Sequence, residues 1–247
     1  MEFIGIIPAR YQSSRFPGKP LVDIHGKSMI QRVYEQCLKA KLNRVIVATD
    51  DTRIFEHVKG FGGEVVMTSN SHESGTDRIA EAASTLQLSE EAVLINIQGD
   101  EPFINPDDIL ALANCFQNAD TCIATLIKAI KEVDVLLNTN SPKVVLGSTK
   151  QALYFSREAI PHLRGGEKKD WITKQTYYQH IGIYAFKHDT LKAISKLPIG
   201  VLEQSEGLEQ LRWLENGYTV QTAEIESECI AVDCPEDLKR IDKKFFS

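Results

Sequence analysis

The chain has 247 residues, of which 43% are hydrophobic and 25% are charged, a composition typical of soluble globular proteins. Its 28 basic and 34 acidic residues give a net charge of -6 at pH 7, which argues against binding to duplex nucleic acid or to an anionic membrane. The sequence contains neither a secretion signal nor an apolar run of about 18 residues. Its five cysteines include no C-x-x-C pair. We therefore expect a cytoplasmic protein with reduced, mostly buried thiols.

The first notable stretch is the loop Pro8–Pro20, which follows a short apolar run, Phe3–Ile7, of strand length. The loop carries three cations, Arg10, Arg15 and Lys19. Small residues between them let backbone N–H groups turn inward, as in phosphate-binding loops; they are Ser13, Ser14 and Gly18. The loop does not match a Walker A motif. It predicts an anion site, and the alternative is a solvated connection with three surface cations.

Strands and helices alternate through the first third of the chain. The apolar stripe from Met29 to Cys37 predicts a helix, and Val45–Ala48 and Glu64–Met67 predict strands. A helix capped by Thr49 or Asp50 is expected between those strands. Such an alternation indicates parallel strands, whose carboxyl ends bind ligands.

Ser74-Gly75-Thr76-Asp77-Arg78 leads into the next predicted helix. Its small residues and exposed helix-terminal N–H groups suit a planar base, with Arg78 meeting a pyrimidine carbonyl. A plain N-cap explains Ser74 or Thr76 equally well.

The continuous apolar run Ala92–Ile97 predicts a buried strand, and Gln98-Gly99-Asp100-Glu101 follows it. A carboxylate at this place suits Mg²⁺ bound to a triphosphate, so Asp100 is the predicted ligand. Glu101 is expected to face the other way, because strand residues alternate. The alternative for Asp100 is a turn or capping role. A helix beginning at Pro106 is expected next.

Beyond Thr121 the predicted strands dominate: Cys122–Leu126, Lys143–Leu146, Ala152–Phe155 and Tyr177–Phe186. They indicate an antiparallel extension that could pair with a second subunit. The polar segment Arg164–Asp170 reads as a mobile loop.

Two further sites are suggested near the end of the chain. In one predicted strand His180, Gly182 and Tyr184 share a face, so a sugar could lie over the glycine; a buried, satisfied histidine is the alternative. Asp233 follows a strand and precedes Pro235, so it could cap the last helix in a capping box with Glu236.

These segments resemble, in order, the motifs of the sugar cytidylyltransferases, and among them the family that activates 3-deoxy-manno-octulosonate (Kdo). The resemblance begins with Pro8-Ala9-Arg10-x-x-Ser13-x-Arg15-x-Pro17-x-Lys19 and continues to about Arg240. Further matches are Ala48–Asp50, Ser74–Arg78, Gln98–Pro102, Ala152–Arg157, His180–Tyr184, Leu208–Arg212 and Val232–Leu238.

The resemblance implies one domain over residues 1–247, with a Rossmann-like nucleotide-diphospho-sugar transferase fold. Its mixed, mostly parallel sheet would be flanked by helices, and residues 121–186 would form an antiparallel extension with the sugar site and the homodimer interface. The implied reaction transfers CMP from CTP to the anomeric hydroxyl of a 2-keto-3-deoxy sugar acid for lipopolysaccharide synthesis.

The resemblance also implies roles for individual residues. The implied nucleotide-binding residues are Arg10, Ser13, Lys19, Ser74, Gly75, Thr76, Arg78 and Gln98. The implied sugar-binding residues are Gln98, Arg157, His180, Tyr184, Glu209 and Gln210. Asp100 and Asp233 would hold Mg²⁺, and Arg10, Arg15, Lys19 and Asp100 would be catalytic. The segments around Asn138–Pro142 and Arg164–Asp170 depart from the family's pattern.

Three alternatives stay open. A related enzyme could activate another sugar acid, such as 8-amino-Kdo or a sialic-type acid. The chain could be a nucleotide-binding regulator without turnover, although it keeps Lys19, Asp100 and Asp233. A glycosyltransferase could have a similar sheet, but Gly99-Asp100-Glu101 is not an Asp-x-Asp motif.

Overall fold

The computed structural model of the chain describes residues 1–12, 16–72, 74–228 and 231–245, the last stretch without the side chains of Arg240 and 242–245. Ser13, Arg15 and Cys229 therefore lie outside the described residues. The chain divides into two compact units: residues 1–110, 187–195 and 227–247, and residues 111–186 and 196–226. A compact unit need not be an independent domain, so one domain over 1–247 stays a prediction.

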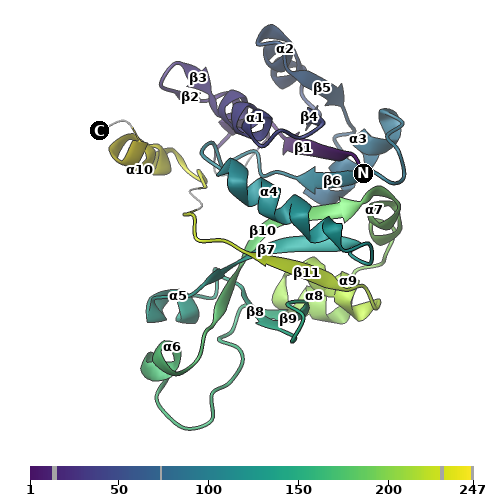
Figure 1. Cartoon of the computed structure of the whole chain (residues 1–247). Helices are drawn as coiled ribbons and strands as arrows, with labels where there is room; N and C mark the ends of the chain where they lie inside the picture. Colours follow the sequence, from purple (N-terminus) through teal and green to yellow (C-terminus); the bar gives the residue numbers. More distant parts are fainter. Residues whose placement is uncertain (13–15, 73, 229–230, 246–247) are drawn as a thin grey trace. The chain divides into compact units, whose positions relative to one another are not determined.

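The first unit is built on four parallel strands in the order β6-β1-β4-β5 (Figure 1). They are β6 (Val93–Asn96), β1 (Phe3–Ala9), β4 (Arg44–Thr49) and β5 (Glu64–Met67). The apolar runs that predicted β1, β4 and β6 are buried. Continuous apolar strands are typical of a parallel sheet that is covered on both faces. The parallel pairing of these strands confirms the predicted α/β arrangement.

The helices α1 (Met29–Lys39), α2 (Thr52–Gly60) and α3 (Gly75–Thr85) pack against these strands. The unit also contains α7 (His188–Ile194) and α10 (Pro235–Phe245), and α4 (Pro106–Asn114) leads into the second unit. The 3₁₀ turn η1 (Lys19–Leu21) and the pair β2 (Asp23–Ile24) and β3 (Lys27–Ser28) precede α1. The predicted apolar stripe of α1 is buried, and Ser28 caps it.

The predicted cap of α2 was wrong. Asp51, not Thr49 or Asp50, accepts the hydrogen bond from the backbone of Arg53. Asp50 forms an ion pair with Arg78 instead.

The second unit contains β7 (Ile123–Ala129), β8 (Lys143–Leu146), β9 (Ala152–Ser156), β10 (Tyr178–Lys187) and β11 (Val220–Glu224). The pairs β7–β10, β8–β10 and β8–β9 are antiparallel, which confirms the predicted extension. β11 runs parallel to β7 and was missed. Its short helices are η2 (Cys115–Gln117), α5 (Val133–Leu137), η3 (Lys168–Asp170), α6 (Trp171–Lys174), α8 (Val201–Glu206) and α9 (Gln210–Glu215).

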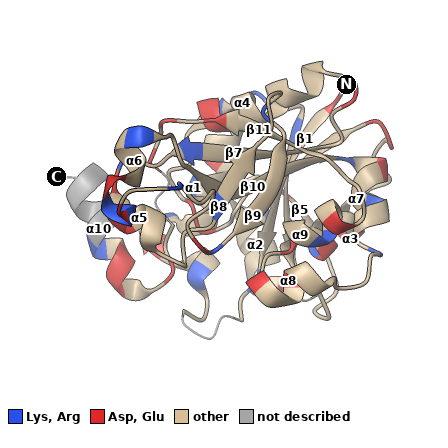
Figure 2. Cartoon of the chain, turned by 90° about the horizontal axis from the view of Figure 1, so that it is seen from below, with Lys and Arg blue, Asp and Glu red and all other residues tan. Residues whose placement is uncertain are grey.

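Figure 2 shows Lys and Arg residues and Asp and Glu residues on many helices and loops of the chain. All four described cysteines are free, but only Cys37 is buried; Cys115, Cys122 and Cys234 are half-buried. The prediction of mostly buried thiols was therefore wrong. Within the described residues, every helix falls short of the length and apolarity required to cross a bilayer.

Candidate active site

The predicted nucleotide-binding segments of the first unit follow strands that end at one edge of the sheet. β1, β4 and β6 are parallel, with Ile6 paired to both Ile46 and Asn96. The opening loop, Asp50 and Gln98 come directly after these strands. The common direction of the strands places their carboxyl ends together, as the sequence predicted.

Lys19 links the two predicted metal ligands. Its Nζ lies 2.9 Å from Oδ2 of Asp100 and 3.6 Å from Oδ1 of Asp233, and donates to the carbonyl of Val232 at 2.9 Å. The backbone N–H of Val232 donates to the carbonyl of Asp100 at 2.9 Å, which fastens the two segments together. The predicted proximity of Asp100 and Asp233 is confirmed.

The alternative role of Asp233, a helix cap in a box with Glu236, stays a prediction. Asp237 accepts hydrogen bonds from the backbone N–H groups of Asp233 and Cys234, at 2.9 and 3.0 Å. The carboxylate of Asp233 lies beside Lys19, with 48% of its side chain exposed.

The donor set of this cluster fits a hard divalent cation. Asp100 and Asp233 offer carboxylate oxygens, and the described residues contain no group of three potential His, Cys, Asp or Glu ligands. Mg²⁺ commonly uses one or two carboxylates and takes its other ligands from substrate phosphate and water. Two carboxylates therefore suit a cation that arrives with a nucleotide.

Glu101 is buried, but it follows a turn beyond the end of β6, so the strand alternation behind its predicted orientation does not apply. Burial, and then the charges of Asp100 and Asp108, raise the pKa of Glu101 to about 7. Gly99 is required for packing: a Cβ there would lie 2.9 Å from the carbonyl oxygen of Pro8. The glycine thus allows β6 to approach β1 just before Asp100.

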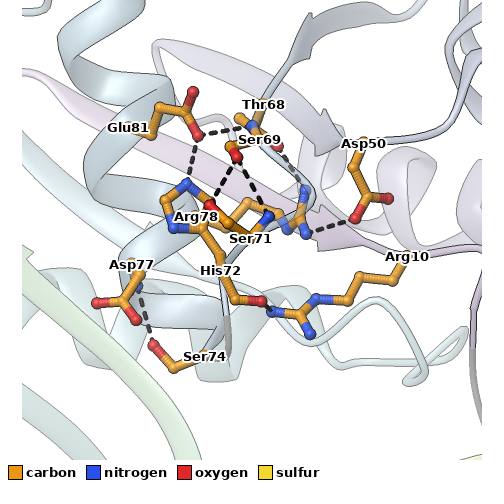
Figure 3. Close-up of polar contacts among 10 residues, drawn as sticks. All are labelled: Arg10, Asp50, Thr68, Ser69, Ser71, His72, Ser74, Asp77, Arg78 and Glu81. Carbon is orange, nitrogen blue, oxygen red and sulfur yellow. Dashed lines mark hydrogen bonds and ion pairs between the residues drawn. The ribbon is translucent and has the colours of Figure 1, made fainter.

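A cavity of about 300 Å³ opens beside the loop; it is lined by Arg10, Tyr11, Gln12, Asp50, Asp51 and Asn70. The guanidinium of Arg10 donates to the carbonyl of His72 (Figure 3). The guanidinium of Arg53 lies over the ring of Tyr11, 3.3 Å from its centroid. One predicted phosphate ligand, Arg10, therefore borders a polar cavity.

Arg78 is fully buried and fixes the segment after β5 (Figure 3). Its Nη2 donates to Asp50 at 2.8 Å and its Nη1 to Thr68 at 2.5 Å. The prediction that Arg78 meets a base carbonyl needs correction, because its guanidinium is enclosed and two of its nitrogens are used. Arg78 is a positioning residue in this structure.

The sequence allowed two interpretations of the segment that begins α3, a base-binding segment and a plain N-cap. Ser74 caps the helix, accepting from the backbone N–H of Asp77 at 3.1 Å. Glu81, one turn further on, accepts from the backbone of Ser69 at 2.8 Å and pairs with the ring of His72. The segment 68–72 is thereby tied to α3, next to Gly75.

In the second unit His180 is buried, and one of its ring nitrogens has a protein partner. Its Nε2 lies 3.0 Å from Oγ1 of Thr125, and burial lowers the pKa of the ring to about 3. The register of β10 shifts between Ile181 and Tyr184, so simple alternation does not hold. The rings of His180 and Tyr184 are nevertheless 5.3 Å apart, and a Cβ at Gly182 would meet no atom within 4 Å. Open space over the glycine is present as predicted.

Two buried polar atoms near Tyr184 lack hydrogen-bond partners within the described structure: Nε2 of Gln210 and Nε1 of Trp213. Gln210 was expected at a boundary but is 4% exposed. The ring of Trp213 packs edge-on against Tyr184 at 5.0 Å. Sequence reasoning missed Trp213, because an apolar helical stripe gives no sign of an unsatisfied indole. Buried polar atoms without a partner are uncommon in folded proteins, and a bound ion, water or ligand is one way to satisfy them.

The guanidinium of Arg157 is used within the second unit. It donates to the backbone carbonyls of Thr139, Glu206 and Gly207, at 3.1, 2.6 and 3.2 Å. The carboxylate of Glu206 accepts from the Ser156 hydroxyl and the Arg157 N–H. Arg157 thus fastens the end of α8, which argues against the predicted contact with a sugar. Glu209 is half-buried at the start of α9 and Gln98 is half-buried after β6.

Comparison with known proteins defines the class. The sequence model of the cytidylyltransferase family matches residues 4–228. The chain belongs to this family. A putative glucose-1-phosphate thymidylyltransferase from Bacillus anthracis shares the fold, with a TM-score of 0.66 at 15% identity.

More similar proteins narrow the comparison. The 3-deoxy-manno-octulosonate cytidylyltransferase of Parabacteroides distasonis is 54% identical over 244 residues, covering 97% of this chain and 96% of its own. The enzyme of the same name from Bacteroides thetaiotaomicron is 52% identical, covering 98% of both chains. A solved CMP:2-keto-3-deoxy-manno-octonic acid synthetase complexed with CTP has a TM-score of 0.91 at 42% identity, covering 98% of both chains.

Proposed function

We propose that this chain transfers CMP from CTP to the anomeric hydroxyl of Kdo, giving CMP-Kdo and pyrophosphate. The observation that carries the proposal is the cluster in which Lys19 lies between Asp100 and Asp233. In this cluster a cation that can bind phosphate lies beside two carboxylates that can bind a divalent metal. Relatives that are 52–54% identical to this chain are named 3-deoxy-manno-octulosonate cytidylyltransferase.

The first unit would bind the nucleotide. Arg10 and Lys19, with Ser13 and Arg15 by resemblance, would contact the triphosphate, and charge-assisted hydrogen bonds from these cations would stabilise the leaving pyrophosphate. The segment Ser74–Thr76, with Gln98, would contact the nucleoside. Arg78 would act through the segment 68–72 that it holds in place.

Asp100 and Asp233 would hold Mg²⁺. When bound, the ion would lower the pKa of the attacking hydroxyl and neutralise phosphate charge. The chain's own contribution is to keep these carboxylates close together by the backbone bond between Val232 and Asp100. The attack would be in line on the α-phosphorus, without a covalent enzyme intermediate.

The second unit would bind the sugar acid. His180, Tyr184, Glu209 and Gln210 are the proposed contacts, and Trp213 joins them because its indole nitrogen is buried without a partner in the described structure. Neutral His180 would exchange hydrogen bonds with hydroxyl groups, since its low pKa keeps it uncharged near pH 7. A cytoplasmic homodimer that serves lipopolysaccharide synthesis completes the proposal.

The test is pyrophosphate release from the purified chain with Mg²⁺, Kdo and, separately, CTP, UTP, ATP or GTP. We expect release with CTP alone. The variant Asp100→Ala should lose most turnover, while Asp107→Ala, an exposed carboxylate in the first turn of α4, should keep it. Full turnover of Asp100→Ala at saturating Mg²⁺ would refute the metal assignment.

The alternatives give different results in the same assay. Release with CTP and 8-amino-Kdo or a sialic-type acid, but not with Kdo, would keep the chemistry and change the substrate. CTP binding without release under any condition would favour a regulator.

A further inference from the structure

Asn96, the last residue of β6, is a polar residue in an apolar strand that no role above explains. It is 5% exposed, and its Oδ1 is fully enclosed without a hydrogen-bond partner among the described residues. The preceding strand residues, Val93, Leu94 and Ile95, are completely buried hydrophobic residues. An unsatisfied amide at the end of such a strand costs stability that a leucine of similar size would not.

The amide of Asn96 is directed at the start of α3. A Cβ added at Gly75 would lie 3.7 Å from Nδ2 of Asn96 and 3.5 Å from the ring of Pro8. Because Gly75 has no side chain, only its backbone lies beside this amide. The first N–H groups of an eleven-residue helix also lie here, and such groups have no partner inside their helix.

We infer that Asn96 binds the polar edge of the pyrimidine base, as a recognition residue of the nucleotide site. This inference rests on the proposed function. An amide presents a donor beside an acceptor, which complements the ring nitrogen and the amino group of cytosine. The amide from β6 and the helix N–H groups from α3 approach the same small volume at Gly75. A ligand hydrogen bond there would satisfy the buried amide, which has no protein partner in the described structure.

The variant Asn96→Leu tests this inference by its melting temperature and its affinity for CTP. A purely structural role of Asn96 would lower the melting temperature and leave the CTP affinity unchanged. The melting temperature without ligand should stay the same or rise, because an unsatisfied polar group is replaced by an apolar one. The Kd for CTP should rise about tenfold or more, the effect of one or two lost hydrogen bonds. The Kd for inorganic tripolyphosphate, which carries no base, should stay unchanged.

Asn114→Ala, an exposed asparagine of α4, is the matched control and should leave all three values unchanged. Asn96→Ser repeats the test with a smaller side chain in case leucine is not accommodated. A lower melting temperature with unchanged CTP affinity would overturn the inference, as would an equal loss of CTP and tripolyphosphate affinity. If the unaltered chain binds no CTP, the proposed function itself fails; if it binds CTP and Asn96→Leu binds it equally well, only the role of Asn96 fails.

Discussion

Lys19 contacts both of the predicted metal ligands, Asp100 and Asp233. In the variant Lys19→Met, turnover should fall roughly a hundredfold or more, because the cation facing the phosphates is lost. Binding of Mn²⁺ without nucleotide should become tighter, because Asp100 and Asp233 lose the ammonium that neutralises them. Mn²⁺ titration followed by electron paramagnetic resonance measures the second effect. Lys27→Met, an exposed lysine paired with Glu35, is the control. Weaker Mn²⁺ binding in Lys19→Met would contradict the assigned geometry.

His180 should make stability depend on pH. Its pKa is about 3 in the folded chain and about 6.5 when unfolded, so between these values the unfolded state binds more protons. The free energy of unfolding therefore falls as the pH drops from 7, by roughly 2 kcal/mol at pH 5. Denaturant titrations of His180→Gln should show a flatter dependence between pH 7 and 5. The exposed residue His25, changed to Asn, should leave the slope intact.

The sequence predicted the site residues unevenly. The family resemblance implied that Lys19, Asp100 and Asp233 lie together, and the structure places both carboxylates beside the Lys19 ammonium. Sequence reasoning misjudged Arg78 and Arg157, because an arginine written beside a motif gives no sign of whether its guanidinium is spent on protein oxygens. That information lies in residues distant in the sequence, such as the carboxylate of Asp50 for Arg78 and the backbone carbonyl of Glu206 for Arg157.

At the scale of elements, the packing of β6 against β1 sets the position of Asp100. In Gly99→Ala the new methyl would lie 2.9 Å from the carbonyl of Pro8, so the backbone must shift. We expect a loss of about 1–3 kcal/mol in stability and a reduced kcat. Gly60→Ala is the control, since a Cβ at the end of α2 meets no atom within 4 Å. Its stability should be unchanged or slightly higher. Equal stability of the two variants would argue against the close approach.

Elements with a strong apolar signal were predicted well. The strands β1, β4 and β6 and the helix α1 match their predicted runs because burial on both faces of a strand, or on one stripe of a helix, fixes the pattern. The edge strand β5 also matches its predicted run, although only Val66 in it is buried. β11 has the sequence Val-Gln-Thr-Ala-Glu, and its weak alternation gave no prediction. The register shift in β10 was also missed, because a bulge depends on the neighbouring strand β7 rather than on β10 alone.

At the scale of the whole molecule, the sequence predicts one domain over residues 1–247, and the chain divides into two compact units that need not be independent domains. The units are interleaved, because residues 187–195 and 227–247 return to the first unit. Composition along a chain reveals linkers between consecutive domains, but it cannot reveal a unit assembled from three separate segments. The match of one family over residues 4–228 covers both units, so their division does not mark two proteins joined together.

The edge strand β9 is a candidate surface for forming a dimer. In the described structure β9 pairs with β8 alone along its length, and Leu153 in β9 is 56% exposed. A strand edge beside an exposed leucine is a natural site for pairing with a second copy. We expect a dimer by light scattering at micromolar concentration, and Leu153→Glu should shift it towards monomer by placing a charge in the interface. Leu38→Glu changes a leucine of equal exposure, 55%, on α1 and should leave the dimer intact. An unaltered chain that is monomeric at this concentration, or a dimer unaffected by Leu153→Glu, would move the interface away from β9. Pyrophosphate release measured on the same monomeric variant would then show whether assembly is needed for turnover or only for stability.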